Sequence, residues 1–264
     1  MSRIPTTFDR LRREGRTGLI AYLTVGFPEP AATPELVRAL VEGGADVIEL
    51  GIPFSDPLAD GATIQRATHV ALRHGVTTGA VIEMARGLRA EGLVVPLVAM
   101  SYYNPILAYG LERFAADAAA AGIDGVIAVD VPPEEDEPLR RALRARDMDL
   151  IYLLAPTSTE ERIHTVAARA SGFIYCVSVT GTTGARGELP PDLPAFIARV
   201  RRHTDLPLAV GFGVSRPEHI AQIGRLCEAA VVGSALIDVI EKAPPEQRAV
   251  RLRTYVEVVT GRRS

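Results

Sequence analysis

The sequence predicts a (β/α)8 barrel, that is a TIM barrel, with an extra helix at its N-terminus. Eight short β-like runs recur, helical patterns separate them, and the 264 residues are close to the ~250 typical of such barrels. The runs cover residues 19–24, 47–50, 97–100, 125–129, 150–154, 173–177, 208–211 and 229–233. Regular alternation of strand and helix favours a closed parallel barrel over an open doubly wound sheet.

The helical segments carry recognisable start and stop signals. We expect the extra helix at about residues 4–14, where it would cover the bottom of the barrel. After the first strand, Thr33 can N-cap a helix over residues 34–42, Pro34 suits its first position and Gly43 ends it. Two later helices open with the spacing of capping boxes, Ser158 with Glu161 and Ser215 with Glu218.

Composition favours one globular domain over residues 1–264 that acts on a small molecule. The chain is 47% hydrophobic, contains no apolar run of 18 residues and carries a formal net charge of -3, which argues against nucleic-acid and membrane surfaces. The N-terminus lacks an apolar signal region, so we expect a cytoplasmic protein. Cys176 and Cys227 stand in apolar surroundings without metal-ligand spacing, and we assign them neither a disulfide nor a metal.

Glu49 is the most informative residue. It lies near the end of the second β-like run, and strand side chains alternate, so if Ile48 and Leu50 pack against helices, Glu49 points into the barrel. Burial favours the protonated carboxyl and brings its pKa toward the range of a general acid or base. The alternative is a hydrogen-bonded interior acid without a catalytic task.

Glycine-rich loops predict a phosphate site. Gly211 and Gly213 follow the seventh run, and Gly233 and Ser234 follow the eighth, each just before a helix. Many barrels hold a phosphate in these loops, against a helix N-terminus. Gly184, in the loop over residues 179–191, can contribute. The alternative is that the glycines only make tight turns. The loops over residues 179–191 and 53–60 are candidate lids.

The residue inventory excludes two kinds of aldolase. The single lysine, Lys242, lies beyond the eighth run, so a Schiff-base mechanism is not expected. The five histidines fall on helices or their edges, and no ligand cluster for a catalytic metal is visible. Carboxylates and hydroxyls remain, namely Glu49, Asp60, Tyr175, Tyr22 and Tyr102. Asp60 could instead N-cap the helix that runs to about residue 73, the tyrosines could be pocket walls, and Asp130 could only shape a loop.

Several strings resemble the tryptophan synthase alpha chain family. The signature runs from Glu49 to Gly61 and contains both acids, Glu49 and Asp60; further matches are residues 23–28, 103–106, 130–132, 180–186 and 211–214. The resemblance implies cleavage of indole-3-glycerol phosphate to indole and glyceraldehyde 3-phosphate, a retro-aldol reaction with no metal or cofactor on this chain. The indole ring, once protonated at C3, would serve as the electron sink.

The resemblance also assigns site residues. It implies that Glu49 protonates C3 and then accepts the hydroxyl proton, and that Asp60 binds the indole N–H. The implied substrate-binding residues are Tyr175, Tyr22, Met100, Tyr102, Ile127, Thr183, Phe212 and Val232, and the implied phosphate-binding residues are Gly184, Gly213, Gly233 and Ser234.

The family implies a partner as well. A pyridoxal-phosphate beta chain would take up the indole in an alpha2beta2 complex, and Asp56, Pro57, Asn104 and Pro132 resemble the surface that meets it. Three alternatives stay open: a stand-alone lyase of the same family, a non-catalytic activator of a beta chain, and an unrelated phosphosugar isomerase. The departures from the family's pattern are Ala62, Gly187 and the hydroxyl of Tyr22.

Overall fold

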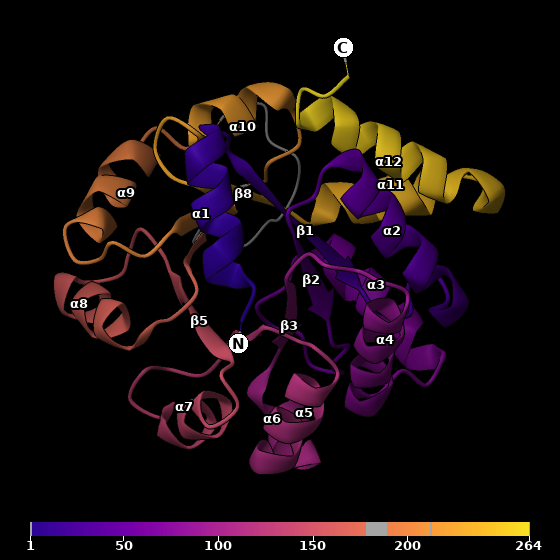
Figure 1. Ribbon diagram of the computed structural model, residues 1–264, viewed down its shortest axis with the longest axis horizontal. Coiled ribbons are helices and arrows are strands. Elements are labelled where there is room, and N and C mark those ends of the chain that lie inside the picture. Colours follow the sequence, from indigo (N-terminus) through magenta and orange to yellow (C-terminus); the bar gives the residue numbers. More distant parts are fainter. Residues whose placement is uncertain (1, 178–188, 212, 264) are drawn as a thin grey trace.

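The computed structural model describes residues 2–177, 189–211 and 213–263, and its centre is a closed barrel of eight parallel strands (Figure 1). Each strand pairs with the next, and the last pairs with the first. The strands are β1 Gly18–Thr24, β2 Val47–Gly51, β3 Leu97–Ser101, β4 Gly125–Ala128, β5 Asp149–Leu154, β6 Ile174–Val177, β7 Leu208–Gly211 and β8 Ala229–Val232. The (β/α)8 prediction is therefore confirmed, with strand ends shifted by at most one residue.

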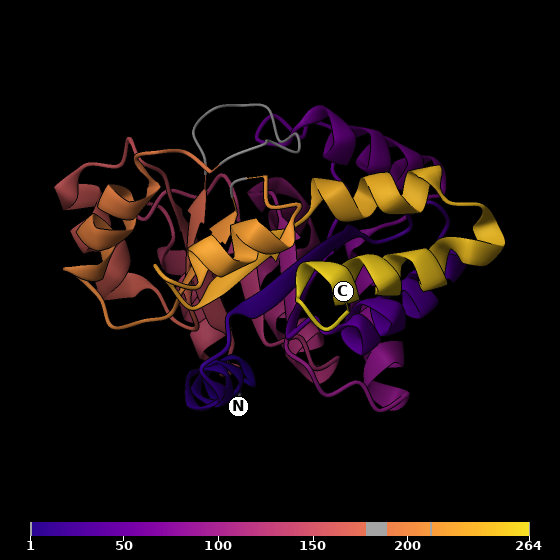
Figure 2. The same cartoon turned by 90° about the horizontal axis from the view of Figure 1, so that it is seen from above.

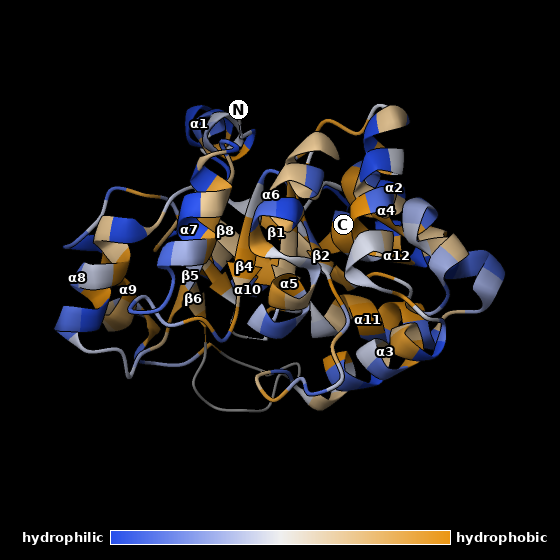
Figure 3. Ribbon diagram, turned by 90° about the horizontal axis from the view of Figure 1, so that it is seen from below, coloured by the Kyte–Doolittle hydropathy of each residue, from blue (hydrophilic) through white to orange (hydrophobic). Residues whose placement is uncertain are grey.

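Helices surround this barrel in sequence order. They are α1 Ile4–Glu14, α2 Thr33–Gly43, α3 Ala62–Arg73, α4 Thr78–Ala90, α5 Tyr103–Tyr109, α6 Leu111–Ala120, α7 Glu137–Arg144, α8 Glu160–Arg169, α9 Leu193–Arg201, α10 Pro217–Ile223, α11 Ser234–Lys242 and α12 Arg248–Val259, with 3-10 turns at Pro30–Ala32 and Pro245–Gln247. Their apolar sides face the strands and their polar sides face outward (Figure 3). None of the helices in the described ranges is long and apolar enough to cross a membrane.

The N-terminal helix α1 covers one end of the barrel, as predicted (Figure 2). Its apolar residues Ile4, Phe8 and Leu11 join the cluster that fills the barrel's interior, and Phe8 lies 5.7 Å from Phe173, centroid to centroid. Polar contacts fasten it further: Arg3 and Arg10 each bind a buried aspartate at 2.9 Å. The carboxyl ends of the strands lie at the opposite end of the barrel, where barrels of this class have their binding sites.

The bottom of the barrel repeats one polar contact four times. A side chain just before each even-numbered strand accepts the backbone N–H at the start of the preceding strand. The pairs are Leu19 N to Asp46, Leu97 N to Asp124, Leu150 N to Ser171 and Leu208 N to Glu228, at 2.9 to 3.2 Å. Arginines neutralise the three acids. These contacts fix the register of neighbouring strands, and therefore the face on which each side chain lies.

Three predicted helix caps are wrong. Thr33 is the first residue of α2, because its hydroxyl accepts the Gly26 N–H instead. Ser158 accepts the Ala155 N–H, and Thr159 caps α8 in its place. The predicted cap at Ser215 is also absent, since α10 begins later and Arg216 occupies the N-cap position without a side-chain bond.

Candidate active site

Glu49 points into the barrel, as strand alternation predicts. It lies on β2 between its register partners Tyr22 on β1 and Val98 on β3, and only 1% of it is exposed. Neither carboxyl oxygen has a hydrogen-bond partner among the described residues. Desolvation by burial raises the pKa of Glu49 from 4.5 to about 8. The carboxyl is therefore mostly protonated at neutral pH and can donate a proton.

Asp60 lies on the loop after β2, and both it and Glu49 act electrostatically on Tyr22. It does not cap α3, whose N-cap is Gly61 without a side-chain bond; instead its Oδ2 accepts a 3.1 Å hydrogen bond from the hydroxyl of Tyr102. Burial raises the pKa of Asp60 to about 6, although the Tyr102 bond acts in the opposite direction. Asp60 is therefore mostly ionised at pH 7, unlike Glu49.

Two more tyrosines complete the polar part of the cavity. The hydroxyl of Tyr22 lies 3.1 Å from Thr24 Oγ1, and a Cβ on Gly51 would lie only 2.4 Å from it. The hydroxyl of Tyr175 lies equally close to the position of a Cβ on Gly211. Burial raises the pKa of both phenols, and the charges of Glu49 and Asp60 raise it further. All three inward tyrosines are therefore neutral.

The predicted wall residues divide between the two faces of the sheet. Met100 and Ile127 belong to or pack against the interior cluster. Val232 does not, because it is the register partner of Ala21 on the outward face of the sheet and packs toward the helices, whereas Val231 faces the interior. Thr183, Gly184 and Phe212 lie outside the described residues.

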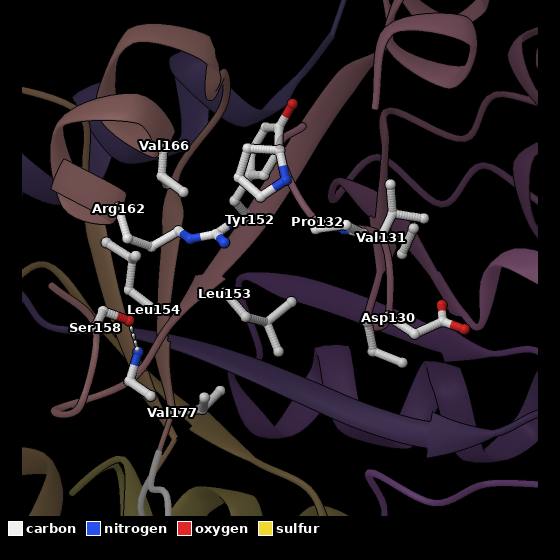
Figure 4. A pocket seen from close by; sticks show the side chains of 14 residues that line it. Asp130, Val131, Pro132, Tyr152, Leu153, Leu154, Ser158, Arg162, Val166 and Val177 are labelled. Atoms are coloured by element: carbon white, nitrogen blue, oxygen red, sulfur yellow. Dashed lines mark hydrogen bonds between the residues drawn. The ribbon is translucent and has the colours of Figure 1, made fainter. Parts of the chain in front are cut away.

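Two cavities open at the carboxyl ends of the strands. A small one, about 10 Å³, lies beside Asp60 and is lined by Tyr22, Ile52, Phe54, Thr68, Met100, Ser101, Tyr102 and Val129. A larger one of about 330 Å³ lies at the ends of β4, β5 and β6 and shares Val129 with the first. In it, the Arg162 side chain extends from α8 toward Pro132 of the β4 loop (Figure 4). No sequence pattern predicted Arg162 or Ser158 as lining residues.

The predicted phosphate loops have the backbone that such a site needs. Gly213 has a φ of 68°, which favours glycine. Gly233 precedes α11, and Ser234 is its first residue, so their N–H groups lie at a helix N-terminus. Two side chains bind the backbone of the β7 loop. The Ser215 N–H donates to His219 Nδ1 at 3.3 Å, and the Ser215 carbonyl accepts a 2.9 Å bond from the Tyr255 hydroxyl.

The predicted partner surface lies on the same end of the barrel. Asp56 and Asn104 are exposed, Pro57 and Pro132 are half-buried, and Leu58, which follows Pro57, is 91% exposed. Asp130 connects two of these segments, because its carboxylate accepts the Tyr103 N–H at 2.7 Å and so binds the start of α5. Asp130 thus has the loop-shaping contact that was one interpretation of this residue.

The described residues offer little for other chemistries. In the ranges 2–177, 189–211 and 213–263, no group of three or more His, Cys, Asp or Glu side chains could hold a metal ion. Lys242 is exposed at the end of α11, close to Asp238 and outside the barrel. Cys176 and Cys227 are both buried and free. The arrangement can therefore do proton transfer with two carboxyls whose pKa values differ, next to apolar walls.

Known proteins resemble this chain over almost its whole length. A family model described as tryptophan synthase alpha chain matches residues 8–261. The chain is 54% identical over 261 residues to the tryptophan synthase alpha chain of Roseiflexus sp. (strain RS-1), covering 99% of this chain and 100% of the relative. The corresponding protein of Chloroflexus aurantiacus is 54% identical over 256 residues, covering 97% and 96%.

Solved structures give the same answer. The fold matches tryptophan synthase subunit alpha from Legionella pneumophila with a TM-score of 0.91 and 37% identity, covering 99% of this chain and 98% of that one. A tryptophan synthase structure from Mycobacterium tuberculosis also gives a TM-score of 0.91, with 38% identity and coverage of 98% and 97%.

Proposed function

Because the chain belongs to the tryptophan synthase alpha chain family, a family of lyases that cleave indole-3-glycerol phosphate, we propose that Glu49 and Asp60 carry this reaction at the carboxyl end of the barrel. The observation that supports the proposal most is the pair of carboxyls with separated pKa values, about 8 for Glu49 and about 6 for Asp60. At neutral pH one is an acid and the other is an anion, and the cleavage needs both.

Glu49 moves the protons of the bond cleavage. The protonated carboxyl gives its proton to C3 of the indole ring, which turns the ring into an iminium-like cation. The electrons of the bond between C3 and the glycerol carbon then return to the ring, and the hydroxyl on that carbon becomes the aldehyde. Its proton goes to the Glu49 carboxylate, which restores the acid. Protons and electrons balance without any further reactant.

Asp60 stabilises the charge on the ring. Its carboxylate accepts a hydrogen bond from the ring N–H, and the bond strengthens as positive charge develops during C3 protonation. The apolar walls around Met100 and Ile127 keep water from the ring, so that the charges of both acids act in a medium of low dielectric constant. Tyr22 and Tyr175 add neutral hydroxyls beside Glu49.

The phosphate of the substrate binds at the loops after β7 and β8. Gly213, Gly233 and Ser234 present N–H groups there, and the α11 N-terminus adds a favourable dipole. We include Gly184, Thr183 and Phe212 in the proposed binding site only because the family's sequence pattern implies them. With the phosphate held on this side, Glu49 on β2 and Asp60 on the loop that follows it, the glycerol chain spans the mouth of the barrel.

We further propose a beta-chain partner. Asp56, Pro57, Asn104 and Pro132 form its docking surface, with two partners of each kind in an alpha2beta2 complex, and the exposed Leu58 supports a contact at this loop. The beta chain would carry pyridoxal phosphate, whereas this chain, one domain over residues 1–264, would use no cofactor. Two free buried cysteines are in keeping with a reducing cytoplasm.

The test is product formation from indole-3-glycerol phosphate by the purified chain in the presence of a chelator. We expect indole and glyceraldehyde 3-phosphate in equal amounts, and faster turnover once a beta chain is added. Isomerised sugar phosphate, or activity that needs added metal, would contradict the proposal. Equal turnover with and without a beta chain would favour a stand-alone lyase. No indole formation by this chain, together with a beta chain that becomes more active when this chain is added, would favour a non-catalytic activator.

A further inference from the structure

Tyr102 makes two hydrogen bonds with consecutive residues of the loop that carries Asp60. Its hydroxyl oxygen lies 2.8 Å from the backbone N of Ala59 and 3.1 Å from Asp60 Oδ2. Tyr102 itself is 7% exposed, follows the end of β3, and packs its ring 5.3 Å from that of Phe54. The phenol is therefore fixed in place and reaches both the backbone and the carboxylate of the loop.

The two bonds determine where the phenol proton lies. A backbone N–H can only donate, so Ala59 occupies a lone pair of the phenol oxygen. The single hydroxyl proton is then free to point to Asp60 Oδ2, which must accept it. This leaves Oδ1 of Asp60 as the oxygen that is available to another donor. The phenol thus assigns different tasks to the two oxygens of one carboxylate.

These bonds also anchor the loop. Within the described part of the chain, the other recorded hydrogen bonds of residues 53–60 stay inside the loop or come from Gln65 of α3. The Tyr102 hydroxyl is what connects the loop to the barrel strands by hydrogen bonding. Ala59 and Leu58 are otherwise exposed to solvent, so without the hydroxyl the position of Asp60 would depend on packing alone.

We propose that Tyr102 is a positioning residue for Asp60: it binds Oδ2 and turns Oδ1 toward the ring N–H of the substrate. The inference rests on the proposed role of Asp60 and adds a task to a side chain otherwise expected only to line the indole pocket. A wall residue would contribute to binding of the ring; a positioning residue contributes to the chemical step and to its pH dependence.

The pH dependence follows from the groups that face Asp60. Tyr22 on β1 and Tyr175 on β6 are its electrostatic neighbours besides Tyr102; Glu49 on β2 acts on the same two tyrosines, and Asp130 acts on Tyr102. The Tyr102 hydrogen bond is the contact that lowers the pKa of Asp60 against the effect of burial. Its loss should therefore raise that pKa.

The experiment is the pH profile of Tyr102→Phe with indole-3-glycerol phosphate from pH 5 to 9. The variant keeps the ring and its contact with Phe54. We expect kcat to fall about tenfold, because a hydrogen bond to a charged group is lost, and KM to change less than about threefold. We also expect the acidic limb of the kcat profile to move up by about one pH unit. Tyr109→Phe removes a hydroxyl that binds Asp117 far from the cavity, and should leave the profile unchanged.

Asp60→Asn, measured alongside, distinguishes a failure of the positioning role of Tyr102 from a failure of the proposed function. If Asp60→Asn is impaired while Tyr102→Phe keeps both the wild-type kcat and the wild-type acidic limb, the positioning role is refuted and the proposed function stands. A change in KM alone in Tyr102→Phe would reduce Tyr102 to a pocket wall and refute it as well. Wild-type activity of Asp60→Asn would refute both. Urea unfolding of each variant confirms that a lost activity is not a lost fold.

Discussion

Burial of Glu49 should make the stability of the protein depend on pH in a way that one substitution removes. The pKa of Glu49 is 4.5 in the unfolded chain and about 8 in the folded one. Below pH 4.5 both states hold the proton, and Glu49 does not affect stability. Between pH 4.5 and 8 the unfolded chain releases the proton while the folded chain keeps it, so unfolding becomes more favourable as pH rises.

The magnitude follows from these two pKa values. They lie about 3.5 pH units apart, and each unit corresponds to about 1.4 kcal/mol, so the free energy of unfolding should fall by ~5 kcal/mol between pH 4.5 and pH 8 because of this one group. Above pH 8 the folded carboxyl ionises as well and the cost levels off. A loss of this size is a large share of the 5–15 kcal/mol typical of a folded domain.

Glu49→Gln isolates the effect. The neutral amide has the same shape and no proton to release, so the variant should lose stability with pH far less steeply than the wild type. Urea unfolding at pH 5, 7 and 9 measures both slopes; the amide's own burial cost does not depend on pH and cancels, as does the contribution of Asp60. Glu35→Gln, at an exposed position on α2, is the matched control and should follow the wild type. Parallel curves for wild type and Glu49→Gln would refute the reasoning.

Three further substitutions test other parts of the site. Asp60→Asn should lower kcat more than it raises KM, because a neutral amide stabilises the cationic ring less than a carboxylate does; a rise in KM alone would contradict this. Gly213→Asp should weaken binding of glycerol 3-phosphate about tenfold or more through charge repulsion and spare indole, by calorimetry; equal losses would show a purely structural loop. Gly51→Ala should lower the free energy of unfolding by ~1–3 kcal/mol, because its Cβ would lie 2.4 Å from the Tyr22 hydroxyl, and an unchanged urea midpoint would disprove that contact.

The fold could be predicted because it depends on local patterns. Alternating strands and helices, together with length, were enough for the barrel, and period-two alternation was enough to place Glu49 inside it. The same rule explains the misplacement of Val232. A one-residue difference in a strand exchanges its faces, and here Val231 takes the interior position.

Hydrogen-bond partners could not be predicted, because they come from distant parts of the chain. Thr33 has the side chain of an N-cap, yet its hydroxyl binds Gly26. Asp60 has the side chain of an N-cap, yet Gly61 takes that position and Tyr102, 42 residues away, binds the Asp60 carboxylate. In both cases a local preference of less than a few kcal/mol competes with a tertiary contact that appears only after the strands align.

The central claim is that a protonated, buried Glu49 starts the cleavage, and its direct measurement is the rate of indole release from indole-3-glycerol phosphate by Glu49→Gln at pH 7, with folding verified by circular dichroism. The account predicts a loss of ~10²-fold to 10⁴-fold, the range expected when a general acid is removed. Release at close to the wild-type rate by the folded variant would contradict it.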